Sequence, residues 1–291
     1  MKPAPFEYVD PRTVDETLQH LRRYGDDGKV LAGGQSLMPM LNLRLARPRV
    51  VIDVNRVTEL DGSSDDGAGL RLGALARQHA VERSARARLP LLAAALELVG
   101  HDAIRHRGTI AGSIAHADPA AELPAVLLAL DGSVVARSTR GERVIAARDF
   151  FQGPLATALA ADELVTETRW PVPAPGTGWG FHEVARRHGD FALVGAVALV
   201  RLAGGIVERA AIAVFGAGPT PVRAAATERA LVGQSPAPAR LTEAAQTVAG
   251  AIDPADDLHA PARYRRRVAV TLVARALTDA VSRATGHGGP R

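Results

Sequence analysis

The stretch Leu31-Ala32-Gly33-Gly34-Gln35-Ser36-Leu37 constrains the fold of this chain more than any other. The residues just before it predict the end of a buried strand. Two glycines follow where the strand stops, so the backbone there can adopt conformations closed to other residues and can approach a ligand closely. Gln35 and Ser36 then add a side-chain amide and a hydroxyl, both able to donate hydrogen bonds.

This turn has two interpretations. Successive backbone N–H groups in such a turn can form a concave site for an anion, typically a phosphate. The alternative is a tight turn that binds nothing, since glycine pairs occur in many loops. The stretch alone leaves both open.

The composition excludes several classes of chemistry. The 291 residues contain no cysteine, so this chain cannot hold disulfides, thiolate zinc sites, cysteine nucleophiles or cysteine-ligated iron–sulfur clusters. The length suggests two domains or one domain with subdomains, and 47% hydrophobic residues are enough for a substantial core. The first residues lack a signal-peptide core, and no apolar run is long enough to cross a bilayer. We therefore expect a cytoplasmic protein without stable membrane insertion.

The net charge of +4 does not indicate a nucleic-acid partner. The basic residues are mostly arginines scattered among alanine, glycine and aspartate. The densest run, Arg263-Tyr264-Arg265-Arg266-Arg267, begins a predicted helix, where a solvated face or a partner contact is the simpler interpretation.

Helices and strands alternate in the first part of the chain. Thr13 and Glu16 predict a helix N-terminus, and Gly25 predicts its end. The apolar pattern predicts strands at 29–31, 50–54, 70–73 and 164–170, a hairpin of 133–138 with 143–146, a polar turn at 62–69, a short helical or irregular segment at 37–45, and helices at 78–84, 89–99 and 120–130.

The proline-rich run from Pro171 to Gly176 predicts a domain boundary, with one domain at 1–175 and another at 176–291. After it we expect a hairpin of 191–202 with 206–215, helices at 224–232, 241–252 and 262–282, and a disordered tail at 286–291. Strands followed by helices are typical of the α+β class.

A second glycine motif, Gly108-Thr109-Ile110-Ala111-Gly112-Ser113, follows the basic run Arg105-His106-Arg107. It is a surface loop or a second anion site. Two such motifs far apart in sequence suit a ligand whose pyrophosphate is held from two sides. Neither has the spaced glycines of a Rossmann fingerprint, and the chain contains no P-loop and no Gly-x-Ser-x-Gly elbow. A Rossmann NAD enzyme, an ATPase and a serine hydrolase are therefore disfavoured.

Polar residues after this motif have several interpretations. His116, Asp118 and Glu122, with His101 or His106, could bind a metal, but they match no established ligand spacing. They could instead contact the ligand, or Asp118 could cap a helix that begins at Pro119.

Phe191 follows Gly189-Asp190 in the second part of the chain. An aromatic side chain there could cover a planar ring. From the residue alone, a place in the core is the favoured interpretation.

The paired glycine motifs resemble those that bind FAD in the molybdenum hydroxylases. Over nearly its whole length the chain is similar to the separate FAD-binding (medium) subunit of this family, which includes carbon monoxide dehydrogenase and xanthine dehydrogenase. Further motifs in the family's order are Phe6-Glu7-Tyr8, Asp118-Pro119-Ala120-Ala121-Glu122-Leu123-Pro124, Gly189-Asp190-Phe191 and Tyr264-Arg265-Arg266.

The resemblance implies a bipartite FAD-binding domain of the vanillyl-alcohol-oxidase (PCMH) type, with subdomains at about 1–56 and 57–175. A smaller carbon monoxide dehydrogenase flavoprotein-type C-terminal domain with a sheet and helices would follow. Both glycine loops would hold the FAD pyrophosphate, Glu122 would lie near the ribityl chain with His116 and Asp118 in the same pocket, and Leu164 and Phe191 would lie near the flavin ring. The implied cofactor-binding residues are Leu31, Ala32, Gly33, Gly34, Gln35, Ser36, Leu37, Gly100, Ile104, Gly108, Thr109, Ile110, Gly112, Ser113, His116, Asp118, Glu122, Leu164 and Phe191. Val99 would also pack against or approach the cofactor.

The implied function is electron transfer. Iron–sulfur clusters of the [2Fe-2S] type on a small partner subunit would pass electrons from a molybdopterin-containing large subunit to FAD on this chain, and FAD would pass them in pairs to an external acceptor. The complex would be a dimer of heterotrimers. We expect no acid–base catalytic residue and no metal ligand on this chain, because the redox chemistry belongs to the cofactor.

Two residues depart from the family pattern. Ala111 replaces a usual glycine and narrows the backbone conformations open at that position, and Phe191 replaces a frequent tyrosine and lacks its hydroxyl. The alternatives to the electron-transfer function are a cofactor-free structural subunit, for which Ala111 is the one supporting feature, and a free-standing FAD-dependent reductase.

Overall fold

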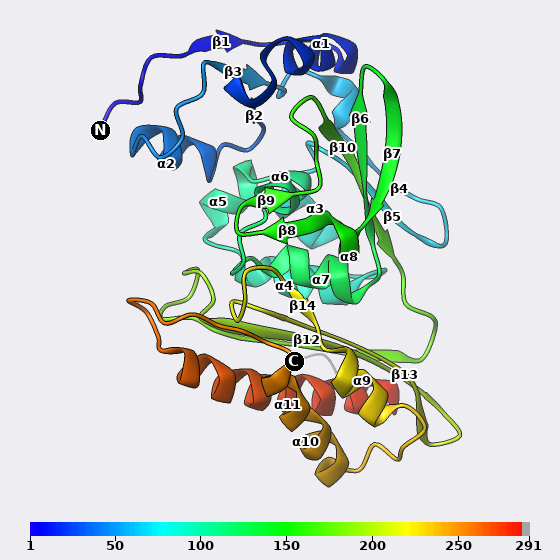
Figure 1. The fold of residues 1–291 in the computed structure, drawn as a ribbon. Coiled ribbons are helices and arrows are strands. Elements are labelled where there is room, and N and C mark those ends of the chain that lie inside the picture. The colour runs from blue at the N-terminus through cyan, green and yellow to red at the C-terminus, as the bar shows by residue number, and fades with distance from the viewer. Residues whose placement is uncertain (287–291) are drawn as a thin grey trace.

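The computed structural model describes residues 1–286, and Figure 1 shows its elements in three stacked layers. A small N-terminal sheet lies at one end, short helices and a five-stranded sheet lie in the middle, and a four-stranded sheet with helices lies at the other end. The predicted α+β class is confirmed. Most of the predicted disordered tail lies outside the described residues, because it begins at Gly286.

The first layer is a parallel sheet in the order β1-β3-β2. Its predicted helix is confirmed: the Thr13 side chain accepts the Glu16 N–H at 3.1 Å, and Gly25 ends the helix with φ of +51°. In the usual capping box, the Glu16 carboxylate would accept from the N–H of the N-cap residue, Thr13. Here it accepts from the N–H of the preceding residue, Arg12, at 2.7 Å. The elements are β1 (Glu7–Val9), α1 (Val14–Tyr24), η1 (Gly25–Asp27), β2 (Gly28–Leu31), α2 (Leu37–Asn42), β3 (Val50–Asp53) and η2 (Thr58–Leu60).

The middle layer contains an antiparallel sheet in the order β4-β5-β10-β6-β7. Its strands are β4 (Ser63–Asp65), β5 (Gly69–Gly73), β6 (Ser133–Ser138), β7 (Gly141–Ala146) and β10 (Leu164–Pro171), and β8 (Phe151–Gly153) pairs with β9 (Ala156–Thr157). Its helices are α3 (Gln78–Ser84), α4 (Pro90–Leu98), α5 (Asp102–Arg107), α6 (Ile110–His116), α7 (Glu122–Ala129) and α8 (Ala147–Phe150).

Two predictions for this layer need correction. The segment 62–69 is not only a turn, because its exposed polar residues Ser63 to Asp65 pair with β5 as an edge strand. The surface-loop interpretation of the second glycine motif is wrong, because Thr109 caps α6 and the helix begins at Ile110, and α5 before it was not predicted.

The last layer is an antiparallel sheet in the order β11-β12-β13-β14, with helices on the side away from the middle layer. The predicted hairpin around Gly204 is confirmed, and the last helix begins at the predicted residue. The helix predicted at 241–252 instead spans Pro238 to Gln246 and continues as a short 3-10 turn. The elements are β11 (Thr177–Val184), β12 (Val194–Ala203), β13 (Ile206–Phe215), β14 (Val222–Arg223), α9 (Ala225–Leu231), α10 (Pro238–Gln246), η3 (Thr247–Gly250) and α11 (Ala262–Ala284).

The C-terminal sheet is covered on both faces. Helix α11 packs along β11 and β12, while α7 of the middle layer packs on β12 and β13 from the other side (Figure 1). The residues from Val194 to Val200 in β12 are all buried, which explains their continuous apolar sequence. None of the helices within residues 1–286 combines the length and apolar character needed to span a membrane.

Gly178 and Gly180 allow α11 to approach β11 closely. A Cβ atom on Gly180 would overlap the carbonyl oxygen of Ala276, and one on Gly178 would overlap that of Ala280. Both alanines are fully buried on α11. The helix therefore rests on bare strand backbone, which leaves no space for a side chain.

We expect Gly180→Ala to destabilise the chain by about 1–3 kcal/mol, because the added methyl group overpacks a backbone contact. The free energy of unfolding is measured by urea denaturation. Gly250→Ala is the control, since a Cβ there meets no atom within 4 Å, and it should lose no stability. Equal stability of both variants would show that α11 can move away from β11 without cost.

Candidate functional site

The first glycine turn connects β2 to α2. Gly33 is buried, and Gly34 has φ of +74°, a backbone conformation that residues with side chains rarely adopt. The Gln35 side-chain amide donates to the Gly33 carbonyl at 3.0 Å, and Met38 N–H donates to the Gly34 carbonyl at 3.1 Å. The sequence thus predicts both the turn and its glycine requirement.

The two glycine motifs meet in space. A Cβ atom on Gly33 would lie 2.5 Å from the carbonyl oxygen of Arg107 and 2.8 Å from the Cα atom of Gly108. Only a glycine fits at position 33 against this backbone, because real Cβ atoms essentially never approach so closely. The expectation that the two distant motifs lie together is confirmed.

The first turn also leaves successive backbone donors free. Among residues 1–286, no protein group accepts a hydrogen bond from the N–H groups of Gly33, Gly34, Gln35, Ser36 or Leu37. Backbone N–H groups left unpaired by the protein are available to a ligand or to water. Such a run of donors suits an anion with several oxygen atoms.

A cavity of about 530 Å³ lies beside this turn and is large enough for part of a large cofactor. Its lining residues are Leu31, Gly33, Gly34, Gln35, Met38, Pro39, Asn42 and Arg107. The Arg107 side chain adds a positive charge to the wall. The first four of these are predicted site residues, and the other four were not predicted. The basic run before Gly108 could have indicated Arg107 as a site residue. Met38, Pro39 and Asn42 line the cavity only because α2 folds against the turn.

A polar relay, formed by the hydrogen-bonded side chains of Asn55 and Arg77, connects the two motifs. The Asn55 side-chain amide donates to the Ala32 carbonyl at 2.8 Å, and its oxygen accepts from the Arg77 guanidinium at 2.6 Å. Arg77 in turn donates to the Arg107 carbonyl. The relay therefore holds the residue before Gly33 and the residue before Gly108, and it fixes their separation. No sequence motif had indicated Asn55 or Arg77.

The second glycine motif is a helix N-terminus. The Thr109 hydroxyl accepts from Gly112 N–H at 3.0 Å and caps α6, with Ser113 in the helix behind it. Gln78 N–H donates to the Gly108 carbonyl, and Ile110 N–H donates to the Ala76 carbonyl. Ala111 is helical and its side chain is buried, so the glycine that the family usually has is not needed for backbone conformation here.

The C-terminal domain reaches the segment before α5. A Cβ atom on Gly189 would lie 2.6 Å from the His101 ring and 2.9 Å from the Gly100 carbonyl oxygen. Gly100 has φ of +51°, and a Cβ atom there would contact the side chain of Ile104. These predicted site residues therefore lie at a junction between the two domains.

Phe191 is not a core residue. Its side chain is 66% exposed, which contradicts the interpretation favoured from the residue alone. It follows the Gly189 contact with Gly100, so an exposed aromatic ring lies just after the domain junction. Leu164, the other residue expected near a ring, is buried at the start of β10.

The segment after α6 carries the buried acid Glu122. Asp118 does not cap α7 directly, because its carboxylate accepts from Ala120 N–H at 2.8 Å and the helix begins at Glu122. Burial, with a smaller contribution from Glu183, raises the pKa of Glu122 to about 8. Burial also raises the pKa of Glu183 on β11 to about 7, and one of its carboxyl oxygens has no hydrogen-bond partner. Burial lowers the pKa of His116. Near neutral pH, Glu122 is therefore largely protonated and Glu183 is about half protonated.

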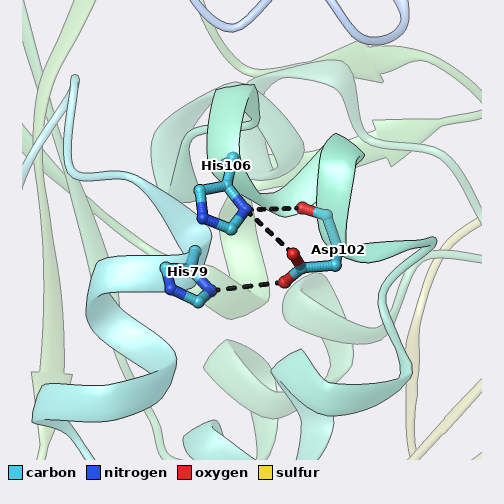
Figure 2. A group of neighbouring side chains, drawn as sticks. All are labelled: His79, Asp102 and His106. Carbon is cyan, nitrogen blue, oxygen red and sulfur yellow. Dashed lines mark hydrogen bonds and ion pairs between the residues drawn. The ribbon is translucent and has the colours of Figure 1, made fainter.

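The residues that the sequence offered for a metal site, His116, Asp118 and Glu122 with His101 or His106, form no ligand cluster among residues 1–286. Within residues 1–286, the histidines and acids that converge are His79, Asp102 and His106 (Figure 2). His106 thus takes part in a cluster with partners that the sequence did not suggest, on the outer side of α3 and α5. His116, Asp118 and Glu122 do not belong to it.

Comparison with known proteins covers nearly the whole chain. Residues 4–173 match the family described as the FAD binding domain in molybdopterin dehydrogenase, and residues 179–280 match the CO dehydrogenase flavoprotein C-terminal domain. Caffeine dehydrogenase subunit beta of Pseudomonas sp. (strain CBB1) is 40% identical over 97% of each chain. The carbon monoxide dehydrogenase medium chain of Hydrogenophaga pseudoflava is 37% identical over 97% of this chain and 99% of its own. In the solved structure of that organism's enzyme lacking the Mo-pyranopterin moiety, the matching chain has a TM-score of 0.95 at 39% identity, covering 97% of this chain and 99% of that one.

The buried acids predict a dependence of stability on pH. Glu122 and Glu183 have folded-state pKa values raised from 4.5 to about 8 and about 7, so the folded chain keeps protons that the unfolded chain has lost. Stability from these groups is therefore fully present below about pH 4.5 and is lost as pH rises through 7 and 8. We expect the free energy of unfolding of the ligand-free chain to fall between about pH 4.5 and pH 8, as measured by urea denaturation.

Glu122→Gln should flatten this decline, because its amide stays neutral at every pH. Glu142→Gln, at an exposed strand position, is the control and should keep the wild-type profile. A Glu122→Gln profile as steep as that of the wild type would show that this carboxyl ionises normally in the folded chain.

Proposed function

The chain belongs to the family of FAD-binding medium subunits of molybdenum hydroxylases, and from this premise we propose that it transfers electrons within a heteromeric complex. Its electrons would come from iron–sulfur clusters on a small partner subunit and leave to an external acceptor. The observation that carries this proposal is the run of unpaired N–H groups at 33–37 beside the cavity.

The residues at the cavity fit FAD. The pyrophosphate of FAD is a doubly charged anion with several oxygen atoms, which matches consecutive backbone donors and the Arg107 guanidinium. The close contact of Gly33 with Gly108 supports a pyrophosphate held between the two motifs. We propose that Gly33 to Leu37 bind it from one side, and that Thr109 to Ser113 at the start of α6 approach it from the other.

The remaining expected contacts follow the flavin outward from the pyrophosphate. We propose that Glu122, with His116 and Asp118, lies along the ribityl chain. A protonated Glu122 can donate a hydrogen bond to a hydroxyl there. Gly100 and Ile104 would approach the ring system, with Leu164 near it. Phe191, exposed and beside the domain junction, is free to stack on the ring.

When bound, FAD supplies the chemistry that converts electrons arriving singly into transferred pairs. This chain's residues bind the pyrophosphate, orient the flavin and limit the access of water to it. We assign no acid–base catalyst among them. Because the chain lacks cysteine, a [2Fe-2S] cluster held by thiolates must lie on a partner. The molybdopterin would lie on the large subunit, and we propose a dimer of heterotrimers as the assembly.

Substrate choice would lie in the large subunit. Relatives named for caffeine and for carbon monoxide, two very different molecules, share 40% and 37% identity with this chain over nearly its full length. Similar chains thus accompany enzymes named for different substrates, which supports a role of this subunit outside the substrate pocket. The cofactor-free alternative loses its support, because Ala111 occupies a helical core position where glycine is not required.

The proposal is tested by the absorption spectrum of the purified complex, which should show one flavin for each copy of this chain. Full turnover by a preparation without flavin would overturn it. A free-standing reductase would instead be active as the isolated chain, so activity that needs the partners separates these two functions.

Gly34→Ala should weaken FAD binding by about tenfold or more, because it changes the left-handed turn that aims the N–H groups. The dissociation constant is measured by flavin fluorescence. Gly205→Ala is the control: its φ of +79° makes it carry the same backbone strain of about 1–2 kcal/mol, but it lies in the β12–β13 turn. Similar FAD affinity in both variants would place the pyrophosphate elsewhere.

Asn55→Ala should weaken FAD binding by about tenfold, because it removes hydrogen bonds that set the separation of the two motifs. Arg88→Ala is the control, since it removes a surface pair with Asp65 in the same domain and should leave FAD affinity unchanged. If Asn55→Ala binds FAD as the wild type does, the relay stabilises the fold without positioning the cofactor site.

A further inference from the structure

We propose that His79, Asp102 and His106 form a binding site for a borderline-soft divalent cation such as Zn²⁺. Figure 2 shows the two imidazole rings side by side, with their Nδ1 atoms directed at the Asp102 carboxylate. His79 comes from α3, while Asp102 and His106 are one helical turn apart on α5. The three candidate ligand atoms lie within 4.8 Å of one another. This site is separate from the cavity beside the glycine turn.

The distances suit metal coordination better than direct ion pairs. The His79 Nδ1 atom lies 3.5 Å from one Asp102 oxygen, and the His106 Nδ1 atom lies 3.3 Å from the other. Charge-assisted hydrogen bonds are shorter, about 2.7–2.9 Å. Two ligand atoms bound tetrahedrally to zinc at about 2.0–2.1 Å lie about 3.3–3.4 Å apart. The observed spacing therefore corresponds to the edges of a zinc coordination shell.

His79 has an unused ligand atom. Its Nδ1 is buried and has no hydrogen-bond partner, an unfavourable state for a polar atom. Coordination to a cation would satisfy this nitrogen. The His106 Nδ1–H donates to the Asp102 carbonyl at 2.9 Å, so metal binding through Nδ1 requires the tautomer whose proton is on Nε2.

The charges around the cluster favour a cation. Arg105 lies 3.7 Å from Asp102, but its guanidinium is held at 3.0 Å by Glu82. Arg86 contacts Glu82 and Glu97. In these ion pairs, three carboxylates (Asp102, Glu82 and Glu97) face two guanidinium groups (Arg86 and Arg105). The charge of Asp102 therefore stays available to a cation. The His79 and His106 rings, stacked at 3.9 Å, would repel each other if both were protonated, and a shared metal removes that repulsion.

A bound cation would link α3 to α5. His106 directly precedes Arg107, which lines the cavity and whose carbonyl contacts Gly33 and Arg77. Arg77 directly precedes α3. The metal would therefore hold together the two helices whose adjoining residues carry the relay between the glycine motifs. Two imidazoles and one carboxylate leave room for water in the shell, and imidazole favours zinc over magnesium or calcium.

The test is zinc binding by the untagged full-length chain after removal of metal by a chelator. We expect one Zn²⁺ for each chain, measured by competition with a chromophoric chelator, and a higher melting temperature with Zn²⁺ but not with Mg²⁺. His79→Asn and His106→Asn should each weaken the affinity by at least about tenfold, since losing even an outer-shell partner of a metal costs about 10–100-fold.

His182→Asn is the matched control, because His182 lies 3.0 Å from the Asp279 carboxylate and belongs to no metal-ligand cluster among residues 1–286. It should bind zinc as the wild type does. Equal affinity of the wild type, His79→Asn and His106→Asn would overturn the proposal, as would the absence of zinc binding. If either variant fails to fold, the visible spectrum of Co²⁺ bound to the wild-type chain decides, because nitrogen ligation gives bands that hydrated Co²⁺ lacks. The readout does not depend on FAD, so its failure leaves the electron-transfer function untouched.

Discussion

The contact between the bare backbone of Gly33 and the Arg107–Gly108 peptide is the constraint on which the site depends. It brings together the end of a parallel strand and the start of α6, two segments that no local interaction would join. Because the strand ends there without a side chain, the following N–H groups can turn toward the cavity and stay free of protein acceptors. The Asn55–Arg77 relay then fixes the same two segments from behind.

Local signals predicted much of the fold. Thr13 and Gly25 define α1 through capping alone, and the apolar runs of β3, β12 and β13 give their strands directly. The helix depends on capping by neighbouring residues, and the strands are fully buried along much of their length. A sequence shows the first as a capping motif and the second as a continuous apolar run. The glycine motifs were also readable, because a glycine pair at a strand end has few structural uses. Their meeting was predicted from the ligand that they suit, since no local pattern reports a distant contact.

What the sequence did not reveal depends on tertiary contacts. Strand β11 contains Gly178 and Gly180, and glycines make a strand harder to recognise in a sequence. Both glycines are required because α11 approaches the strand backbone closely. Phe191 is exposed and lies two residues after Gly189, which contacts Gly100 from a distant part of the chain. Asn55, Arg77 and Glu183 belong to no motif, and each acquires its role only where β3, α3 or β11 meets another segment.

The C-terminal domain has a physical reason to adjoin the cofactor domain. Its sheet is buried between α7 and α11, so the cofactor domain supplies one of the two apolar covers that the sheet requires. Glu183 lies near Glu122 at the same junction, and burial raises the pKa of both carboxyl groups because it disfavours their charged forms. Moving the domains apart would expose apolar surface and let both acids ionise. Domain packing and the protonation of Glu122 are therefore coupled, and the junction that positions Phe191 is most stable while these acids keep their protons.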